Sequence, residues 1–210
     1  MKTILITGGS SGIGLNLVQY LLKLKTYKII YTYNTNEIII NNPLCKSYKV
    51  NFRDDQQFNN FLNFLDSINV DILINNYHTG FFPVHSHKVD ESNILKGFVS
   101  NVIPTILVTN RLLVKFRQAK SGKIITVLSD LLRSNNSIGK TLYIAEKNYL
   151  LSFVQGWELE NKSYGISSFA IFPKAISTNI NRHLNPNLFP VVEETTFDEL
   201  NLEFINLINL

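Results

Sequence analysis

Several features that would mark particular classes of protein are scarce or missing in this 210-residue sequence. Its single cysteine, Cys45, excludes an intrachain disulfide and suits a reducing cytoplasm. No apolar run approaches the roughly 20 residues that a membrane span needs, and the first apolar run lacks the cleavage site of a signal peptide. We therefore expect a cytoplasmic protein without a membrane partner.

Strong charge of one sign is also missing. There are 20 Lys and Arg against 16 Asp and Glu, which gives a formal net charge of +4, and the basic residues are scattered along the chain. Because nucleic-acid binding proteins concentrate basic residues in patches, we expect no nucleic-acid partner. The small excess fits an ordinary solvated surface or a weak attraction of an anionic cofactor or substrate.

Three of the four histidines lie close together in the sequence, at His78, His85 and His87. Further ligands at metal-binding spacing are lacking, so we predict no metal site. The segment follows an expected strand, at the edge of the sheet where substrates bind, so contact with substrate is one hypothesis. A plain surface loop is the other.

Apolar runs rich in β-branched residues alternate with longer segments of helical period. This alternation predicts an α/β fold, in which helices cover both faces of a parallel sheet, as a single domain over residues 1–210. Pro104 predicts a kink in its helix. The expected strands are residues 2–6, 28–32, 47–50, 71–75, 123–127 and 167–172, and the expected helices are 12–25, 54–68, 92–118, 141–161 and a tail from Glu193.

A glycine-rich loop, TGGSSGIG at residues 7–14, joins the first expected strand to the first expected helix. Gly8 permits a sharp turn, Gly12 lets the backbone approach a pyrophosphate, and Gly14 lets the helix pack on the sheet. The free N–H groups and the positive dipole at the helix N-terminus then suit a phosphate. A glycine-rich turn without a ligand is the alternative.

Tyr143 and Lys147 are one helical turn apart and therefore project from the same face of a helix. A lone Tyr-x-x-x-Lys match is weak evidence, because ordinary helix surfaces contain it by chance. A neighbouring ammonium favours phenolate over phenol and lowers the pKa of a tyrosine from about 10. If the pair is functional, we expect Lys147 to tune Tyr143.

The glycine spacing resembles that of the short-chain dehydrogenase/reductase family, and further motifs match in order to about residue 182. Asn101 and Ser129 stand at the positions of the family's active-site asparagine and serine, and Tyr143-x-Ala145-x-Lys147 matches its catalytic segment. The resemblance implies a Rossmann-type doubly wound sheet of about six strands, in the order 3-2-1-4-5-6. It also implies an oxidoreductase that reduces a carbonyl to an alcohol with NAD(P).

The same resemblance implies a role for each residue of this set. Tyr143 donates the proton, Lys147 tunes it and holds the nicotinamide ribose, and Ser129 stabilises the substrate oxygen. Asn101 holds a water that connects Lys147 to solvent.

A cofactor site along the strand ends is implied as well. The second expected strand has no acidic residue after it before Glu37, which favours NADP and leaves NAD possible. Asn51 would accept a hydrogen bond from the adenine, and Ile176 would offer its backbone N–H to the nicotinamide carboxamide. The residues expected to bind the cofactor are Thr7, Gly8, Ser10, Ser11, Gly12, Ile13, Gly14, Tyr33, Asn34, Thr35, Asn51, Phe52, Asn75, Asn76, Tyr143, Lys147, Pro173, Ile176 and Thr178.

Some positions depart from the family pattern. Tyr77 and His78 replace two small residues beside the adenosine, and Lys174 replaces a glycine. The seventh strand with which family members close is missing, so we expect a truncated member with a short substrate lid at about 179–198. These departures keep an alternative open, in which the chain is an NADP-binding relative of weak or no activity with a regulatory or structural role.

Two helices carry more apolar residues than one buried face needs, namely 92–118 and 143–161. The corresponding helices pair in a dimer interface in the family, so the resemblance implies a homodimer through them. The apolar residues that suggest this surface are Leu107, Leu112, Leu151, Phe153 and Trp157.

Overall fold

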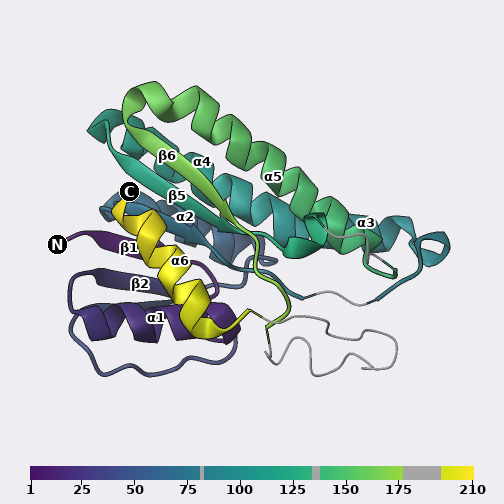
Figure 1. Cartoon of the computed structure of the whole chain (residues 1–210), viewed down its shortest axis with the longest axis horizontal. Coiled ribbons are helices and arrows are strands. Elements are labelled where there is room, and N and C mark those ends of the chain that lie inside the picture. The colour runs from purple at the N-terminus through teal and green to yellow at the C-terminus, as the bar shows by residue number, and fades with distance from the viewer. Residues whose placement is uncertain (81–82, 134–137, 177–194) are drawn as a thin grey trace.

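The computed structural model describes residues 1–80, 83–133, 138–176 and 195–210, and in this part of the chain six parallel strands form one sheet between layers of helices (Figure 1). Their order, β3-β2-β1-β4-β5-β6, confirms the predicted α/β fold and topology. The strands are β1 (Thr3–Ile6), β2 (Lys28–Tyr33), β3 (Cys45–Lys49), β4 (Ile72–Asn75), β5 (Gly122–Val127) and β6 (Ile166–Ile171).

The central strands are apolar at nearly every position because helices cover both of their faces. Ile4, Leu5 and Ile6 of β1 are all fully buried, and they pair in register with the three apolar residues that begin β4. Burying a side chain of this size contributes about 1.5–3 kcal/mol. The centre of the sheet is therefore the most strongly stabilised part of the fold.

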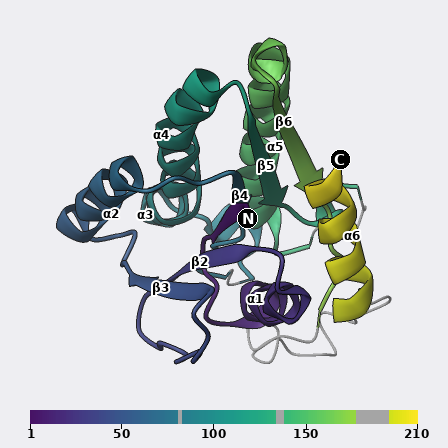
Figure 2. The same ribbon diagram turned by 90° about the vertical axis from the view of Figure 1, so that its left-hand side faces the viewer.

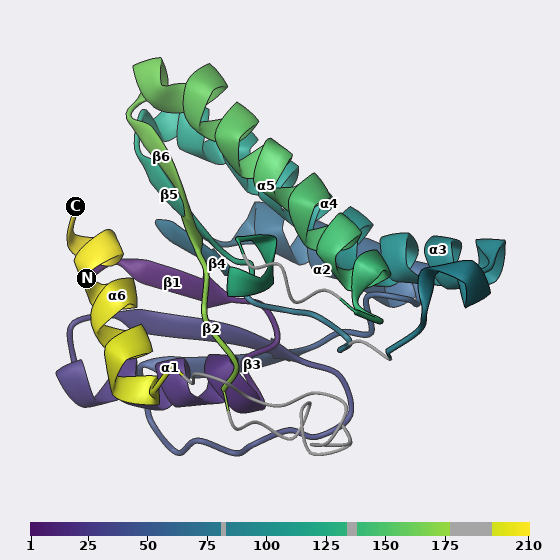
Figure 3. The ribbon, with the colours of Figure 1, turned by 45° about the vertical axis from the view of Figure 1, so that its right-hand side comes forward.

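Two helical layers enclose this sheet. α1 and α6 cover one face, and α2, α4 and α5 cover the other (Figures 2 and 3). The link from β2 to β3 contains no helix, as its short length suggests. The helices are α1 (Gly12–Leu24), α2 (Asp55–Ser67), α3 (Glu91–Gly97), α4 (Ile103–Ala119), α5 (Thr141–Asn161) and α6 (Phe197–Asn209), with short turns η1 (Ser86–Lys88), η3 (Asp130–Leu132) and η4 (Lys162–Tyr164).

The helix predicted over 92–118 runs from Glu91 to Ala119 and contains one irregular turn. This π-helical turn, η2 (Phe98–Val102), separates α3 from α4. Pro104 lies directly after it, in the first turn of α4, and the kink predicted at Pro104 stays a prediction. The wider turn places Asn101, which is 3% exposed, in the interior.

By length and composition alone, the helical stretch Glu91–Ala119 is the one in the described ranges that qualifies as a membrane span. Half of its most apolar window is buried inside the protein. A core helix of a globular protein passes the same test, and here the buried apolar face packs against the sheet and α2.

The last helix is fixed at both ends. A capping box of Thr196 and Glu199 begins α6, and Lys123 of β5 donates from Nζ to the backbone oxygens of Leu207 and Ile208 at its end. Just before α6, the N–H of Thr195 donates to the oxygen of Ala175 at 3.0 Å. The Lys174 N–H donates to Thr195 Oγ1, also at 3.0 Å.

Most of the predicted lid, residues 179–194, lies outside the described residues, as does Thr178. Residues 197–198 belong to the first turn of α6, so the predicted lid extends too far at this end.

The packing of Gly122 yields a stability prediction. A Cβ at this position would lie 2.3 Å from Cγ of buried Phe116, whereas a Cβ at Gly156 in α5 would meet nothing closer than 4.0 Å. We expect Gly122→Ala to lower the free energy of unfolding by about 1–3 kcal/mol. Gly156→Ala should raise it by about 0.5–1 kcal/mol, because alanine favours the helix.

Urea unfolding of the two variants beside the unchanged protein measures both effects. Equal stability of the two variants would contradict the packing described here.

Candidate active site

All six strands run in the same direction, so their carboxyl ends lie along one edge of the sheet. The predicted site residues follow these ends. β1 leads into the glycine loop, β2 into Asn34 and Thr35, β3 into Asn51, and β5 into Ser129. The topology therefore brings to one edge segments that are far apart in the sequence.

The backbone of the glycine loop has the shape that its sequence predicts. Gly8 and Gly12 have φ angles of +67° and +51°, a region that residues with a side chain rarely adopt. A Cβ on Gly14 would lie 2.3 Å from the oxygen of Gly8, so the start of α1 packs directly on the turn. The turn at Gly8 and the close packing at Gly14 match the predicted shape of the loop, and the approach of Gly12 to a pyrophosphate stays a prediction.

Two polar residues join the loop to β4. Thr7 is 4% exposed, and its Oγ1 accepts hydrogen bonds from the N–H groups of Asn76 and Tyr77, both at 3.1 Å. The side chain of Asn76 donates to the oxygens of Thr7 and Gly8, at 3.1 and 2.9 Å. Both residues were expected to bind the cofactor, and in this structure their hydrogen bonds shape the loop.

The N-terminus of α1 is open. Its N-cap residue, Ser11, makes no side-chain capping bond, and its first turn holds no acidic residue. By contrast, Asp54 caps α2 through the N–H of Gln57. The first N–H groups of α1, near Ile13 and the partly exposed Ser10, therefore remain available to an anion. This arrangement fits the pyrophosphate of a dinucleotide.

Three of the predicted cofactor residues have side chains that are engaged within the protein. Asn75 is buried and donates to Thr109 Oγ1 on α4 at 2.9 Å. Phe52 packs in the core, so it can offer only its backbone to a ligand. The side-chain oxygen of Asn51 accepts from the N–H of Arg53 at 3.1 Å, which uses one of its two lone pairs.

Ser129, Tyr143 and Lys147 meet beyond β5. Ser129 is 7% exposed, and its hydroxyl lies close enough to Tyr143 to lower the pKa of the phenol. Lys147 is 4% exposed and donates from Nζ to the oxygen of Val127 at 2.9 Å. Its Nζ lies 5.8 Å from the centre of the Tyr143 ring. The pair on α5 is therefore part of a site and not ordinary helix surface.

Burial sets the protonation of this pair. It raises the pKa of Tyr143 to about 12, and the Ser129 hydroxyl only partly opposes the rise. Burial also lowers the pKa of Lys147 to about 8, against the pull of the Glu146 carboxylate. In the protein without cofactor the pKa of Tyr143 is thus raised and not lowered, because the loss of water around the phenol dominates.

Asn101 lies in the π-helical turn with both ends of its side chain engaged. Its Oδ1 accepts from the N–H and the hydroxyl of Thr79, at 2.9 and 2.8 Å. Its Nδ2 donates to Glu146 Oε2 at 2.9 Å. Asn101 thus contacts Glu146, the residue that precedes Lys147 on α5. Its predicted role of holding a water stays a prediction.

The two large residues after β4 point in different directions. The ring of Tyr77 packs against Phe52, with centroids 4.5 Å apart. His78 lies instead among Asn101, Tyr143, Glu146 and Lys147, a group that we call the catalytic cluster. Its ring is edge-on to that of Tyr143, with centroids 5.1 Å apart, and its Nε2 contacts Glu146. The departure at His78 therefore adds a side chain to the catalytic side of the site.

Two more of the predicted contacts can be placed after β6. Pro173 and Ile176 are both buried, and the oxygen of Pro173 accepts from the N–H of Asp130, beside Ser129. The segment that is predicted to hold the nicotinamide therefore adjoins Ser129.

A family model described as short chain dehydrogenase matches residues 2–188. The chain belongs to the short chain dehydrogenase family. It is 27% identical over 194 residues to an uncharacterized oxidoreductase of Bacillus subtilis, YmfI, a match that covers 88% of this chain and 79% of that protein. It is 26% identical over 188 residues to the 3-oxoacyl-(acyl-carrier-protein) reductase FabG of Rickettsia typhi, over 88% of this chain and 76% of that protein.

Solved structures of other short chain dehydrogenases share the fold. ElxO with NADP bound gives a TM-score of 0.84 at 20% identity, over 98% of this chain and 90% of that one. A short-chain dehydrogenase from Sphingobium yanoikuyae in complex with NADPH gives 0.85 at 21% identity, over 100% and 84%. As a member of this family, the protein is an NAD(P)-dependent oxidoreductase.

One buried residue of this short chain dehydrogenase was not predicted as part of the site. Glu146 is 3% exposed and lies between Tyr143 and Lys147 on α5. The sequence does carry a signal for it, because a residue three positions after Tyr143 lies on the same helical face. A carboxylate at that position is one turn from the reacting phenol.

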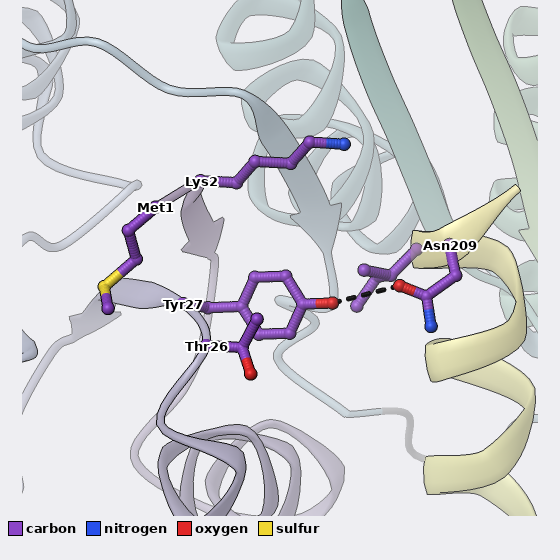
Figure 4. Close-up of a pocket in the computed structure, with 6 residues that line it drawn as sticks. Met1, Lys2, Thr26, Tyr27 and Asn209 are labelled. Carbon is purple, nitrogen blue, oxygen red and sulfur yellow. Dashed lines mark hydrogen bonds between the residues drawn. The ribbon is translucent and has the colours of Figure 1, made fainter.

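A hollow of about 320 Å³ lies at the opposite edge of the sheet, where the chain start meets the end of α6 (Figure 4). Tyr27 donates from its hydroxyl to Asn209 Oδ1 there, at 3.1 Å. The hollow lies at the amino ends of the parallel strands, whereas the candidate active site lies at their carboxyl ends. It is lined by Met1, Lys2, Thr26, Tyr27, Ile208 and Asn209.

The histidine segment divides between the site and the surface. His85 and His87 are exposed and stack on each other at 5.9 Å, away from the catalytic cluster that holds His78. Within the described stretches, no three His, Cys, Asp or Glu side chains are grouped as a metal ion requires.

His78 makes the stability of this dehydrogenase sensitive to acid. Burial, aided by the nearby Lys147 ammonium, lowers the pKa of His78 from 6.5 to about 4. The unfolded chain therefore binds a proton at a higher pH than the folded chain. The stabilisation that neutral His78 provides is complete above pH 6.5 and is lost as the pH falls towards 4, by about 3 kcal/mol in all.

We expect His78→Gln to lose less stability than the unchanged protein between pH 7 and pH 4.5, and His85→Gln, at an exposed position, to behave like the unchanged protein. Urea unfolding at several pH values measures the difference. Parallel pH curves for His78→Gln and the unchanged protein would show that the histidine is not buried in its neutral form.

Proposed function

We propose that the protein reduces a carbonyl group to an alcohol with NADPH, and that Ser129, Tyr143, Lys147 and Asn101 carry the reaction. The observation that supports this most strongly is the meeting of buried Ser129 and buried Lys147 at Tyr143, at the sheet edge that also holds the open N-terminus of α1. The relatives named 3-oxoacyl-(acyl-carrier-protein) reductase support a ketone as the reducible group.

When bound, NADPH would supply the hydride to the carbonyl carbon. Tyr143 acts as the acid, because burial keeps its phenol protonated at neutral pH and the proton is available to the carbonyl oxygen. Ser129 donates a hydrogen bond to the same oxygen and stabilises the charge that develops on it. The Lys147 ammonium then stabilises the phenolate that remains on Tyr143.

The preference for NADPH over NADH rests on the end of β2. Asn34 and Thr35 are exposed there and can donate hydrogen bonds to a 2′-phosphate, with Tyr33 beside them. The next acidic residue, Glu37, accepts a hydrogen bond from Ser47 on β3. One oxygen of its carboxylate is thus used by Ser47.

We also propose that the protein forms a homodimer, through an apolar stripe made by Val99, Ile103 and Leu107. All three are between 41% and 48% exposed and are four residues apart, on one helical face. Tyr149 of α5 continues the stripe through its contact with Phe98, at 5.0 Å. Two residues of the predicted surface were wrongly assigned, because Leu112 and Trp157 are 0% and 4% exposed and belong to the core, whereas Leu151 and Phe153 are partly buried.

A cytoplasmic location is part of the same proposal. Cys45 is a lone, partly buried thiol, and burial raises its pKa to about 11. Such a thiol is a weak nucleophile and suits a reducing compartment.

Tyr143→Phe tests the catalytic proposal. Loss of the proton donor should lower the rate of NADPH-dependent reduction by about 10²–10⁴-fold, while the affinity for NADPH, measured by fluorescence titration, changes little. Tyr149→Phe is the matched control, since Tyr149 lies on the same helix but is 45% exposed, and it should keep full activity. NADH should bind more weakly than NADPH.

A panel of ketones, aldehydes and β-keto thioesters supplies the substrates for these assays. Turnover by Tyr143→Phe at the unchanged rate would exclude the mechanism. NADPH binding without turnover of any carbonyl compound would favour the alternative, a cofactor-binding relative without enzymatic activity.

Leu107→Asp tests the dimer. A charge in the middle of the apolar stripe should shift the protein to monomers at micromolar concentration, as measured by sedimentation velocity. Leu202→Asp is the control, because Leu202 is 58% exposed on α6, on the other face of the sheet. A monomeric unchanged protein would disprove the dimer.

A further inference from the structure

Glu146 is a buried acidic residue that the reaction described above does not use. Its Oε2 accepts hydrogen bonds from Asn101 Nδ2 at 2.9 Å and from His78 Nε2 at 3.1 Å. Its Oε1 lies against Gly97 of α3, where an added Cβ would be only 2.0 Å away. Three separate segments of the chain thus meet at one carboxylate, and a glycine leaves the space that it needs.

The hydrogen bonds of His78 define its tautomer. The N–H of Gly80 donates to Nδ1 at 3.0 Å, so Nδ1 carries no proton. The proton of the neutral ring is therefore on Nε2, and it is donated to Glu146. This assignment agrees with the lowered pKa of His78, which keeps the ring neutral at physiological pH.

The orientation of Asn101 is fixed in the same way. Because its Oδ1 accepts from the backbone N–H of Thr79, its amide nitrogen must face Glu146. An uncharged partner that can accept one hydrogen bond would satisfy this nitrogen. The carboxylate supplies a negative charge in addition.

That charge acts on the proposed catalytic pair. Lys147 is the next residue on α5 and is as deeply buried as Glu146, and its Nζ donates to the oxygen of Val127, so carboxylate and ammonium act on each other through space inside the protein. Burial lowers the pKa of Lys147, and Glu146 opposes the fall. The other titratable groups around the cluster are Tyr143 on α5, His78 after β4, and Asp130 in η3, which acts on Tyr143.

We propose that Glu146 is a positioning residue that fixes Asn101 and His78 and serves as the counter-charge that keeps the Lys147 ammonium protonated beside Tyr143. The proposal rests on the proposed function only for its effect on turnover. What it predicts for the pKa of Lys147 in the protein without cofactor does not depend on that function.

Glu146→Gln separates charge from position, because glutamine can accept the same hydrogen bonds without the negative charge. Loss of the charge should lower the pKa of Lys147, by on the order of one unit. A lower pKa means that the ammonium loses its proton at a lower pH. The alkaline fall in the rate of carbonyl reduction should therefore begin at lower pH in this variant.

The first measurement uses the protein without cofactor. The ¹³Cε resonance of Lys147, assigned by its loss in Lys147→Arg, is followed against pH in protein labelled with ¹³C-lysine. We expect its midpoint to move to lower pH in Glu146→Gln and to stay unchanged in Glu160→Gln, where an exposed carboxylate on the same helix is neutralised. An unchanged midpoint in Glu146→Gln would overturn the proposal whether or not the protein is active.

The second measurement is the pH dependence of kcat and KM with NADPH and a ketone. A shifted ¹³Cε midpoint together with a shifted alkaline limb supports the whole proposal. A shifted midpoint in a protein that reduces no carbonyl would retain the electrostatic role of Glu146 and reject the proposed function. A shifted midpoint with an unmoved alkaline limb would show that the Lys147 charge does not limit turnover and would overturn the catalytic part.

Gly97→Ala provides a second variant in case Glu146→Gln does not fold. The added methyl group must displace the carboxylate, so it should move the Lys147 midpoint in the same direction. An unmoved midpoint in a folded Gly97→Ala protein would count against the proposal.

Discussion

The pairing of β1 with β4 is the interaction on which the rest of the site depends. These two strands are the point where the sheet order reverses, and dinucleotides bind at such a point in folds of this kind. Thr7 and Asn76 join the ends of the strands by hydrogen bonds to backbone groups. Their contacts hold the glycine loop on one side and aim His78 into the catalytic cluster on the other.

Hydrogen bonds within the catalytic cluster explain why it can contain so many buried polar groups. A buried amide, carboxylate, imidazole or ammonium is destabilising unless it is paired. Here the side chains of Asn101, Glu146 and His78 form a connected set of hydrogen bonds, and Lys147 is held by the oxygen of Val127. Each of these four side chains thus has a hydrogen-bond partner within the protein itself.

Much of this structure was predictable from the sequence. The apolar runs gave the strands to within a few residues, and the glycine spacing identified the first turn, because both depend on local chemistry. The π-helical turn η2, which precedes Pro104, was not predicted, because no residue type marks such a turn. The engaged side chains of Asn75 and Phe52, and the burial of Leu112 and Trp157, depend on which helix packs on which face. No single segment of the sequence contains that information.

The hydrogen bonds between Thr195 and residues 174–175 have a further consequence for how this fold can change. They hold the end of the chain after β6 against the start of α6. The position of α6 on the sheet therefore does not depend on the conformation of the chain between these two points. Doubling the length of such a closed segment costs only about 0.6 kcal/mol. The length of the chain between these two ends can therefore change, in evolution or by grafting, at little cost to the sheet and α6.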